Sequence, residues 1–163
     1  MSCRKSEFEV KVARLSKIMN EKQLTGILLK KQPNFTWLTA GGLNMVGIAT
    51  EMGVASLLIT KTGRYLIANN IEGPRLMQEE GLDELGFELL QHEWHVDREA
   101  ELVRQVCGEL TGVGADAAFG PCLNVEADIR SQRFSLTDSE IERYLFLGEK
   151  LSAAIEKIML GIR

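Results

Sequence analysis

The sequence of 163 residues is poor in the residues that build disulfide, metal and nucleophilic sites. It holds three cysteines, Cys3, Cys107 and Cys122, and two histidines, His92 and His95. No two cysteines form a Cys-x-x-Cys pair, and a widely spaced, odd-numbered set does not make a disulfide framework. This cysteine usage predicts reduced thiols and a cytoplasmic location.

The sequence also lacks the features that mark membrane and nucleic-acid binding. No stretch approaches the ~18 consecutive apolar residues of a transmembrane helix, and residues 1–15 carry charges where a signal peptide has its apolar core. Nineteen Lys and Arg against 23 Asp and Glu give a formal net charge of −4, which does not supply the clustered basic surface that nucleic acid requires. We therefore expect neither a membrane nor a nucleic-acid partner.

Apolar residues make up 45% of the chain and charged residues 26%, which is typical of a globular domain. Apolar residues at three- and four-residue spacing predict an amphipathic helix over residues 7–22. A short apolar run at Ile27 to Leu29 predicts a buried strand, and the β-rich "FTWLT" of residues 35–39 predicts a second one. Alternation along that second strand would put Phe35, Trp37 and Thr39 on one face.

The clearest local signal is "GVASLLITKTGRYLIAN", residues 53–69, which predicts a β-hairpin that turns at Lys61-Thr62-Gly63. After it we expect a short helix that ends at Gly81, a strand in "GFELLQHEW", a helix over 97–110, the strand "GVGAD" and a helix over 123–131. Strands that alternate with helices, together with one hairpin, predict an α/β fold with a mixed sheet.

The final segment differs in kind from the rest. Thr137 as N-cap and Glu140 three residues later form a capping box, and a helix of about 20 residues follows with Ile141, Leu151 and Ile155 on one side. A long apolar-striped helix at the end of the chain predicts that the chain is part of something larger.

The sequence holds no set of residues that makes a self-sufficient enzyme. It contains neither a P-loop nor a dinucleotide-binding fingerprint. His92 and His95 stand in a strand pattern, where residues three apart point to opposite faces, so we interpret them as surface side chains rather than metal ligands. Cys107 is interpreted as a small core residue, whereas Cys122 lies in a loop, and a nucleophilic role for either thiol stays open. The strands "GILLKK", "VASLLIT" and "RYLIAN" carry no acidic residue, which argues against a nuclease of the RNase H type.

Five motifs, taken in order, resemble one family along nearly the whole chain. They are "IMNEKQLTGILL", "NFTWLTAGG", "ASLLITKTGRYLIAN", "GVGAD" and "LTDSEIERYLFLGEKLSAAIEKIM". Together they resemble the N-terminal domain of the creatinase, prolidase and aminopeptidase P family, the pita-bread metallopeptidases. Two features depart from the family pattern: Ala40 precedes Gly41-Gly42, and "FSLTDSE" replaces the usual step into the long helix.

The resemblance implies an α/β, three-layer mixed β-sheet flanked by helices, with an RNase H-like motif, over residues 1–135. It implies that residues 136–163 are a linker helix that leads to a catalytic domain absent from this chain. That domain would hold two divalent metal ions, such as Mn, Co or Zn, and bind the peptide substrate. This chain would hold neither metal nor catalytic residues; its implied role in a metal-dependent Xaa-Pro peptidase is substrate gating and homodimer formation.

The implied site lies where the family's loop leaves toward an active site. The candidates for lining a substrate pocket or a dimer contact are Trp37, Thr39, Gly41, Gly42, Leu43 and Asn44. The alternative is that Trp37 and Leu38 are core residues and that the two glycines only end a strand. Two alternative functions also stand: a peptidase-like binding scaffold without a metal site, as in the large subunit of the FACT histone chaperone, and a creatinase-like hydrolase of small molecules.

Overall fold

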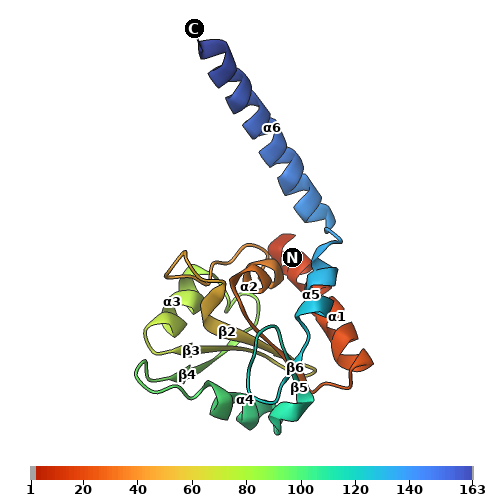
Figure 1. Ribbon diagram of the computed structural model, residues 1–163, viewed down its shortest axis with the longest axis vertical. Helices are drawn as coiled ribbons and strands as arrows, with labels where there is room; N and C mark the ends of the chain where they lie inside the picture. Colours follow the sequence, from red (N-terminus) through yellow and green to blue (C-terminus); the bar gives the residue numbers. More distant parts are fainter. Residues whose placement is uncertain (1–2, 163) are drawn as a thin grey trace. The chain divides into compact units, whose positions relative to one another are not determined.

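The computed structural model describes residues 3–162, shown in Figure 1. The chain divides into a compact unit, which ends at Arg133, and a second unit that begins at Phe134. This boundary lies two residues before the predicted end of the first domain. The compact unit carries the sheet, and the second unit is a single long helix.

A six-stranded mixed sheet forms the middle of the compact unit, in the order β4-β3-β2-β1-β5-β6. The predicted hairpin is confirmed, because β2 pairs antiparallel with both β1 and β3. The pairs β1–β5, β3–β4 and β5–β6 are parallel. The strand bounds are β1 Gly26–Lys31, β2 Met52–Thr60, β3 Arg64–Asn69, β4 Glu88–His92, β5 Val113–Ala115 and β6 Leu123–Asn124.

Helices cover both faces of this sheet, which confirms the predicted α/β class. One face packs against α1 (Cys3–Glu21), α2 (Gln32–Leu38), α3 (Glu72–Glu79) and α5 (Glu126–Arg133) through one apolar cluster. The other face packs against α4 (Glu99–Cys107) and the 3-10 turn η1 (Leu110–Gly112) through a second cluster. Strand β1 illustrates how the sheet forms the middle of three layers, because its successive side chains point to opposite faces. Ile27 and Leu29 belong to the first cluster, and Leu28 belongs to the second.

The prediction of a strand over "FTWLT" is wrong, since these residues belong to the helix α2 and its end. Pro33 occupies the first turn of α2, where its missing N–H costs no hydrogen bond. The amide of Thr39 donates to the carbonyl oxygen of Phe35 at 2.9 Å, four residues earlier. A seven-residue helix is too short for the helical spacing of its apolar residues to be recognised in the sequence. Packing against the sheet overrides the β propensity of Phe, Thr and Trp.

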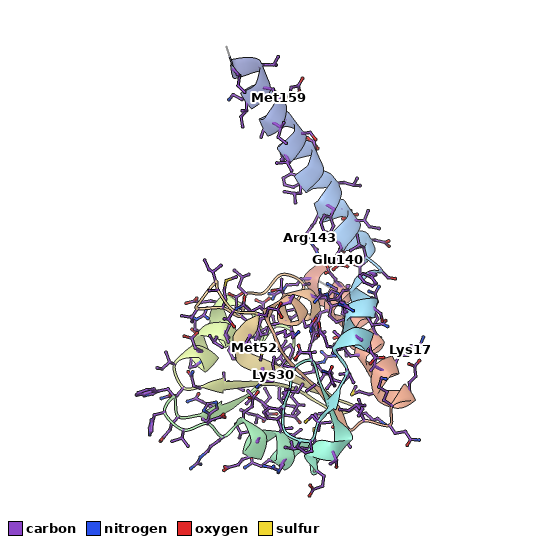
Figure 2. All side chains as sticks on the ribbon, viewed as in Figure 1. Lys17, Lys30, Met52, Glu140, Arg143 and Met159 are labelled. Atoms are coloured by element: carbon purple, nitrogen blue, oxygen red, sulfur yellow. The ribbon has the colours of Figure 1, made fainter. Side chains whose placement is uncertain are left out.

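The second unit holds α6 (Asp138–Gly161). Its predicted start is confirmed: Thr137 accepts a hydrogen bond from the amide of Glu140, whose carboxylate accepts one from the amide of Thr137 at 2.8 Å. Figure 2 shows side chains projecting from all around this helix, with Glu140, Arg143 and Met159 labelled. No helix among the described residues has the length and apolar character needed to cross a membrane.

Candidate functional site: an apolar loop on a polar base

Asn34, the first residue of "NFTWLTAGGLN", is fully buried and connects three elements of the compact unit. Its amide nitrogen donates to Asp116 Oδ2 at 2.9 Å and to Glu126 Oε2 at 2.8 Å. Its amide oxygen accepts from Arg133 at 2.7 Å. This side chain therefore fixes the first turn of α2 to the end of β5 and to α5.

Asp116 follows β5 directly and is almost fully buried. Its two carboxylate oxygens accept from the backbone amides of Lys30 and Lys31 at 2.7 and 3.0 Å, in addition to Asn34. Burial raises the pKa of Asp116, and the hydrogen bonds from Asn34, Lys30 and Lys31 partly oppose that rise. Sequence reasoning missed both Asn34 and Asp116 as site residues, although an acid placed directly after a buried strand was a usable signal.

The end of α2 needs both glycines of the motif, and the structure accounts for them in different ways. Thr39 donates its hydroxyl to the carbonyl of Phe35 at 2.8 Å and accepts from the amide of Gly42 at 3.0 Å. A Cβ on Gly42 would lie 2.7 Å from that hydroxyl oxygen, so no larger residue fits there. Gly41 has φ +116°, a backbone conformation that favours glycine. These residues turn the chain out of the helix and into the following loop.

The side chain of Asn44 hydrogen-bonds to backbone groups of β2, as a neighbouring strand would. Its amide oxygen accepts from the backbone amides of Val54 and Ala55 at 3.1 Å each, and its amide nitrogen donates to the carbonyl of Ala55 at 2.7 Å. A Cβ on Gly53 would lie 2.0 Å from the Asn44 Nδ2, so this contact requires glycine at position 53. Asn44 is almost fully buried and holds the start of the loop against the sheet.

Gln32 holds the other end of the same loop. Its side-chain nitrogen donates to the carbonyls of Thr50 and Met52 at 3.0 Å each, and its backbone amide donates to the carbonyl of Glu51 at 2.8 Å. Residues 43–51 are thus fixed at both ends by buried or partly buried amide side chains.

The loop itself presents apolar side chains to solvent. Leu43 is 49% exposed, Val46 70% and Ile48 90%. The backbone amide of Leu43 donates to the carboxylate of Glu80 at 2.8 Å, which adds a third fixed point at the end of α3. We call Leu43, Met45, Val46 and Ile48 the apolar tip. A fixed base below exposed apolar side chains is suited to contact another surface or a ligand.

Trp37 lies in the core rather than in a pocket. It is 8% exposed and belongs to the larger apolar cluster. Its indole N–H has no hydrogen-bond partner among the described residues, and its carbonyl accepts from Lys11 at 2.7 Å. Of the six predicted site residues, Trp37, Thr39, Gly42 and Asn44 are buried, whereas Gly41 and Leu43 are exposed.

The remaining candidate groups among the described residues are His95 and the free thiols of Cys107 and Cys122. His95 lies 3.3 Å from the carboxylate of Glu93 and is exposed. Burial raises the pKa of the Cys107 thiol and of the Cys122 thiol, which disfavours the nucleophilic thiolate at neutral pH. Among residues 3–162, no three His, Cys, Asp or Glu side chains gather in a group that would hold a metal ion. The described residues do not fit a dinuclear metal centre.

No family model and no curated protein matches this chain, whereas several solved structures share its fold. An Xaa-Pro dipeptidase from Bacillus anthracis matches with a TM-score of 0.65 and 22% identity, over 96% of this chain and 44% of that one. The prolidase from Pyrococcus horikoshii OT3 matches with a TM-score of 0.62 and 17% identity, over 94% of this chain and 43% of that one.

The N-terminal domain of FACT complex subunit SPT16 from Cicer arietinum (chickpea) also matches, with a TM-score of 0.51 and 12% identity, over 94% of this chain and 46% of that one. The chain thus spans less than half the length of each of these three proteins. At such low identity the likeness concerns the fold. The predicted resemblance is confirmed at that level: this chain has the mixed α/β fold found in Xaa-Pro peptidases of the prolidase type and spans less than half of their length.

Proposed function

We propose that this chain is the non-catalytic N-terminal domain of a metal-dependent Xaa-Pro peptidase, in which it contributes to substrate gating and to a homodimer. The single observation that carries the proposal is the apolar tip on its fixed base, within a fold shared with an Xaa-Pro dipeptidase over 96% of this chain. The two divalent ions and the peptide-cleaving groups belong, in this proposal, to another domain. No step of the hydrolysis involves the residues of this chain directly.

The apolar tip supports a gating role through its rigidity. Asn44 and Gln32 remove much of the freedom of the loop before any ligand arrives, so the entropy cost of ordering it on contact is small. Val46 and Ile48 would then supply an apolar wall that favours substrates with apolar side chains by contact alone.

The surface of the helix α6 supports the part of the proposal that makes this chain one domain of a larger protein. Between positions 141 and 162 the charged residues recur every seven positions, as Glu142-Arg143, Glu149-Lys150 and Glu156-Lys157. Two adjacent positions on a helix are ~100° apart, and a seven-residue repeat drifts by ~20° each time it recurs, so the charges lie within about 140° of the circumference. The remainder is apolar or small, with Leu151 and Ile158 more than half exposed. A helix that is apolar over most of its surface is normally enclosed by other protein.

The test is the protein made from the complete reading frame that contains these 163 codons. We expect it to carry two Asp, one His and two Glu as metal ligands beyond residue 163 and to hydrolyse Xaa-Pro dipeptides when Mn²⁺ is supplied. The 163-residue chain, assayed alongside it, is the control and should be inactive. A complete product that lacks those ligands, or that has them but cleaves no Xaa-Pro bond, would contradict the proposal.

A second candidate is a binding scaffold with a peptidase-like fold and no metal site. The observation in its favour is the match to the N-terminal domain of SPT16 over 94% of this chain. The same assay separates the two candidates, because a scaffold would show no metal-dependent hydrolysis under any condition.

A further inference from the structure

The sheet has two edges, and they differ in what they offer to another strand. At one edge β6 is only two residues long. At the other edge β4 has five residues, and among the described residues no strand pairs with its outer side. An unpaired edge of this length presents backbone donors and acceptors that a further strand can use.

The register of β3 and β4 shows which backbone groups of β4 point outward. The carbonyl of His92 accepts from the amide of Asn70 at 2.8 Å, in a parallel pair that aligns Asn69 with His92. In a parallel ladder, alternate residues direct both N–H and C=O toward the same neighbour. Glu88, Leu90 and His92 therefore bond to β3, and Leu89 and Gln91 direct their N–H and C=O groups away from the sheet.

We propose that β4 pairs antiparallel with β4 of a second copy of this chain, about a two-fold axis at Leu90. In that register Leu89 and the partner's Gln91 exchange two backbone hydrogen bonds, and the symmetric pair does the same. Leu90 then lies opposite the partner's Leu90 in a non-hydrogen-bonded pair. The outward backbone groups of Leu89 and Gln91 are all used, and the pairing inside each copy stays unchanged.

The side chains of β4 fit this symmetric register. Glu88 lies opposite the partner's His92, twice per dimer, so that a carboxylate faces an imidazole in the closely spaced, non-hydrogen-bonded position. Leu90 is only partly buried and packs against the cluster beneath α4, so its exposed part would be covered by the partner's Leu90. Like charges do not face each other anywhere in the five-residue strand.

The charges next to His92 do not prevent this pairing. Glu93 is 3.3 Å from His95, and Glu101 is 4.0 Å from Arg98, so both nearby carboxylates already face a basic side chain. A hollow of about 420 Å³ lies beside the end of the strand, and its lining includes His92 and Arg98. The partner's Glu88 would enter beside these two side chains.

We assign the partner strand to a second copy of this chain because the β4 edge is complementary to itself. An acid and an imidazole lie at equal distances on either side of Leu90, which is the arrangement that a two-fold, isologous contact requires. The inference deepens the homodimer part of the proposed function and rests on that part alone.

The test is disulfide cross-linking of the full chain. In a non-hydrogen-bonded antiparallel pair the Cα atoms are ~4.5 Å apart, within the roughly 4.4–6.8 Å range of a disulfide. Leu90→Cys should therefore give a covalent dimer under mild oxidation, in at least tenfold higher yield than Gln91→Cys, whose copies are offset by two residues. Wild type oxidised in parallel measures the background from Cys3, Cys107 and Cys122.

Gln91→Pro provides a second measurement by sedimentation velocity. It removes an outward N–H and no bond to β3, so the dissociation constant of the dimer should rise at least tenfold while the circular dichroism spectrum stays unchanged. Equal cross-linking at positions 90 and 91, a monomer at all concentrations, or a dimer insensitive to Gln91→Pro would overturn the pairing. Neither readout depends on peptidase activity, so a failure here is distinguishable from a failure of the proposed function.

Discussion

The amide of Asn34 donates to the carboxylate of Asp116 at 2.9 Å, with both side chains excluded from solvent. This contact joins the first turn of α2 to the end of β5, two elements that are more than 70 residues apart in sequence. Because α2 leads directly into the loop with the apolar tip, the pair sets where that loop begins. The position of the candidate site therefore depends on a buried hydrogen bond as well as on apolar packing.

Asn34→Ala should lower the free energy of unfolding by about 3 kcal/mol, because it leaves the buried carboxylate of Asp116 and the partly buried guanidinium of Arg133 without this partner. Urea unfolding followed by circular dichroism measures the change. Asn20→Ala, at an exposed position in α1, is the matched control and should change stability by less than ~0.5 kcal/mol. Equal effects of the two substitutions would contradict the tethering role of Asn34.

The pH dependence of stability should report the raised pKa of Asp116. The unfolded carboxyl titrates near its ordinary value of 3.8, and the folded one titrates higher because it is buried. An acid with a raised folded pKa binds its proton more tightly when folded, so this stabilising contribution is present below pH 3.8 and is lost as pH rises through the folded pKa.

Asp116→Asn removes that titration, so the stability difference, wild type minus variant, should fall as pH rises from 3.8 to the folded pKa and then level off. Unfolding free energies of both proteins across this window give the curve. A difference that increases with pH would show that the hydrogen bonds from Lys30, Lys31 and Asn34 outweigh burial.

Gly53→Ala should destabilise the loop base because its Cβ would lie 2.0 Å from the Asn44 Nδ2. We expect a loss of about 2 kcal/mol and faster amide hydrogen exchange at residues 43–51. Gly47→Ala, which meets nothing within 4 Å in the same loop, is the control and should be neutral. In an Asn44→Ala background the Gly53→Ala substitution should lower the free energy of unfolding by much less. An undiminished loss would show that the effect of Gly53→Ala does not arise from contact with Asn44.

Trp37→Ala should cost about 3–5 kcal/mol, as expected for removing a buried indole. Trp37→Phe should cost clearly less, because the indole N–H has no partner among the described residues and only part of the volume is lost. Thermal unfolding of both variants measures the order. If Trp37→Phe costs as much as Trp37→Ala, the indole nitrogen makes a contact that the structure does not show.

Most of the sheet was predictable from the sequence because its strands carry local signals. The run from Val54 to Ala68 has two apolar stretches around a short turn with Gly63, and the structure pairs them as predicted. The capping box of Thr137 and Glu140 is equally local and is confirmed. Both features were identified correctly because the signal for each lies in neighbouring residues of the sequence.

The candidate site was less predictable because its contacts are long-range. Whether Phe35 and Trp37 belong to a helix or a strand depends on packing against β1 and β2, which "FTWLT" does not encode alone. The partners of Asn34 are 82 and more residues away. Asn44 was singled out as a contact residue, and the structure gives it a defined role as a strand substitute; its predicted role in a pocket or a dimer stays a prediction.

The most direct test of the apolar tip is a comparison of two valines in the protein made from the complete reading frame. Val46, in the tip, is 70% exposed, and Val10, on α1, is 47% exposed. Val46→Glu should lower kcat/KM for an Xaa-Pro dipeptide by about tenfold, the equivalent of ~1.4 kcal/mol of lost apolar contact, whereas Val10→Glu should leave it within twofold. Equal kcat/KM values for both variants and the wild type would contradict the claim that the tip forms part of the substrate site.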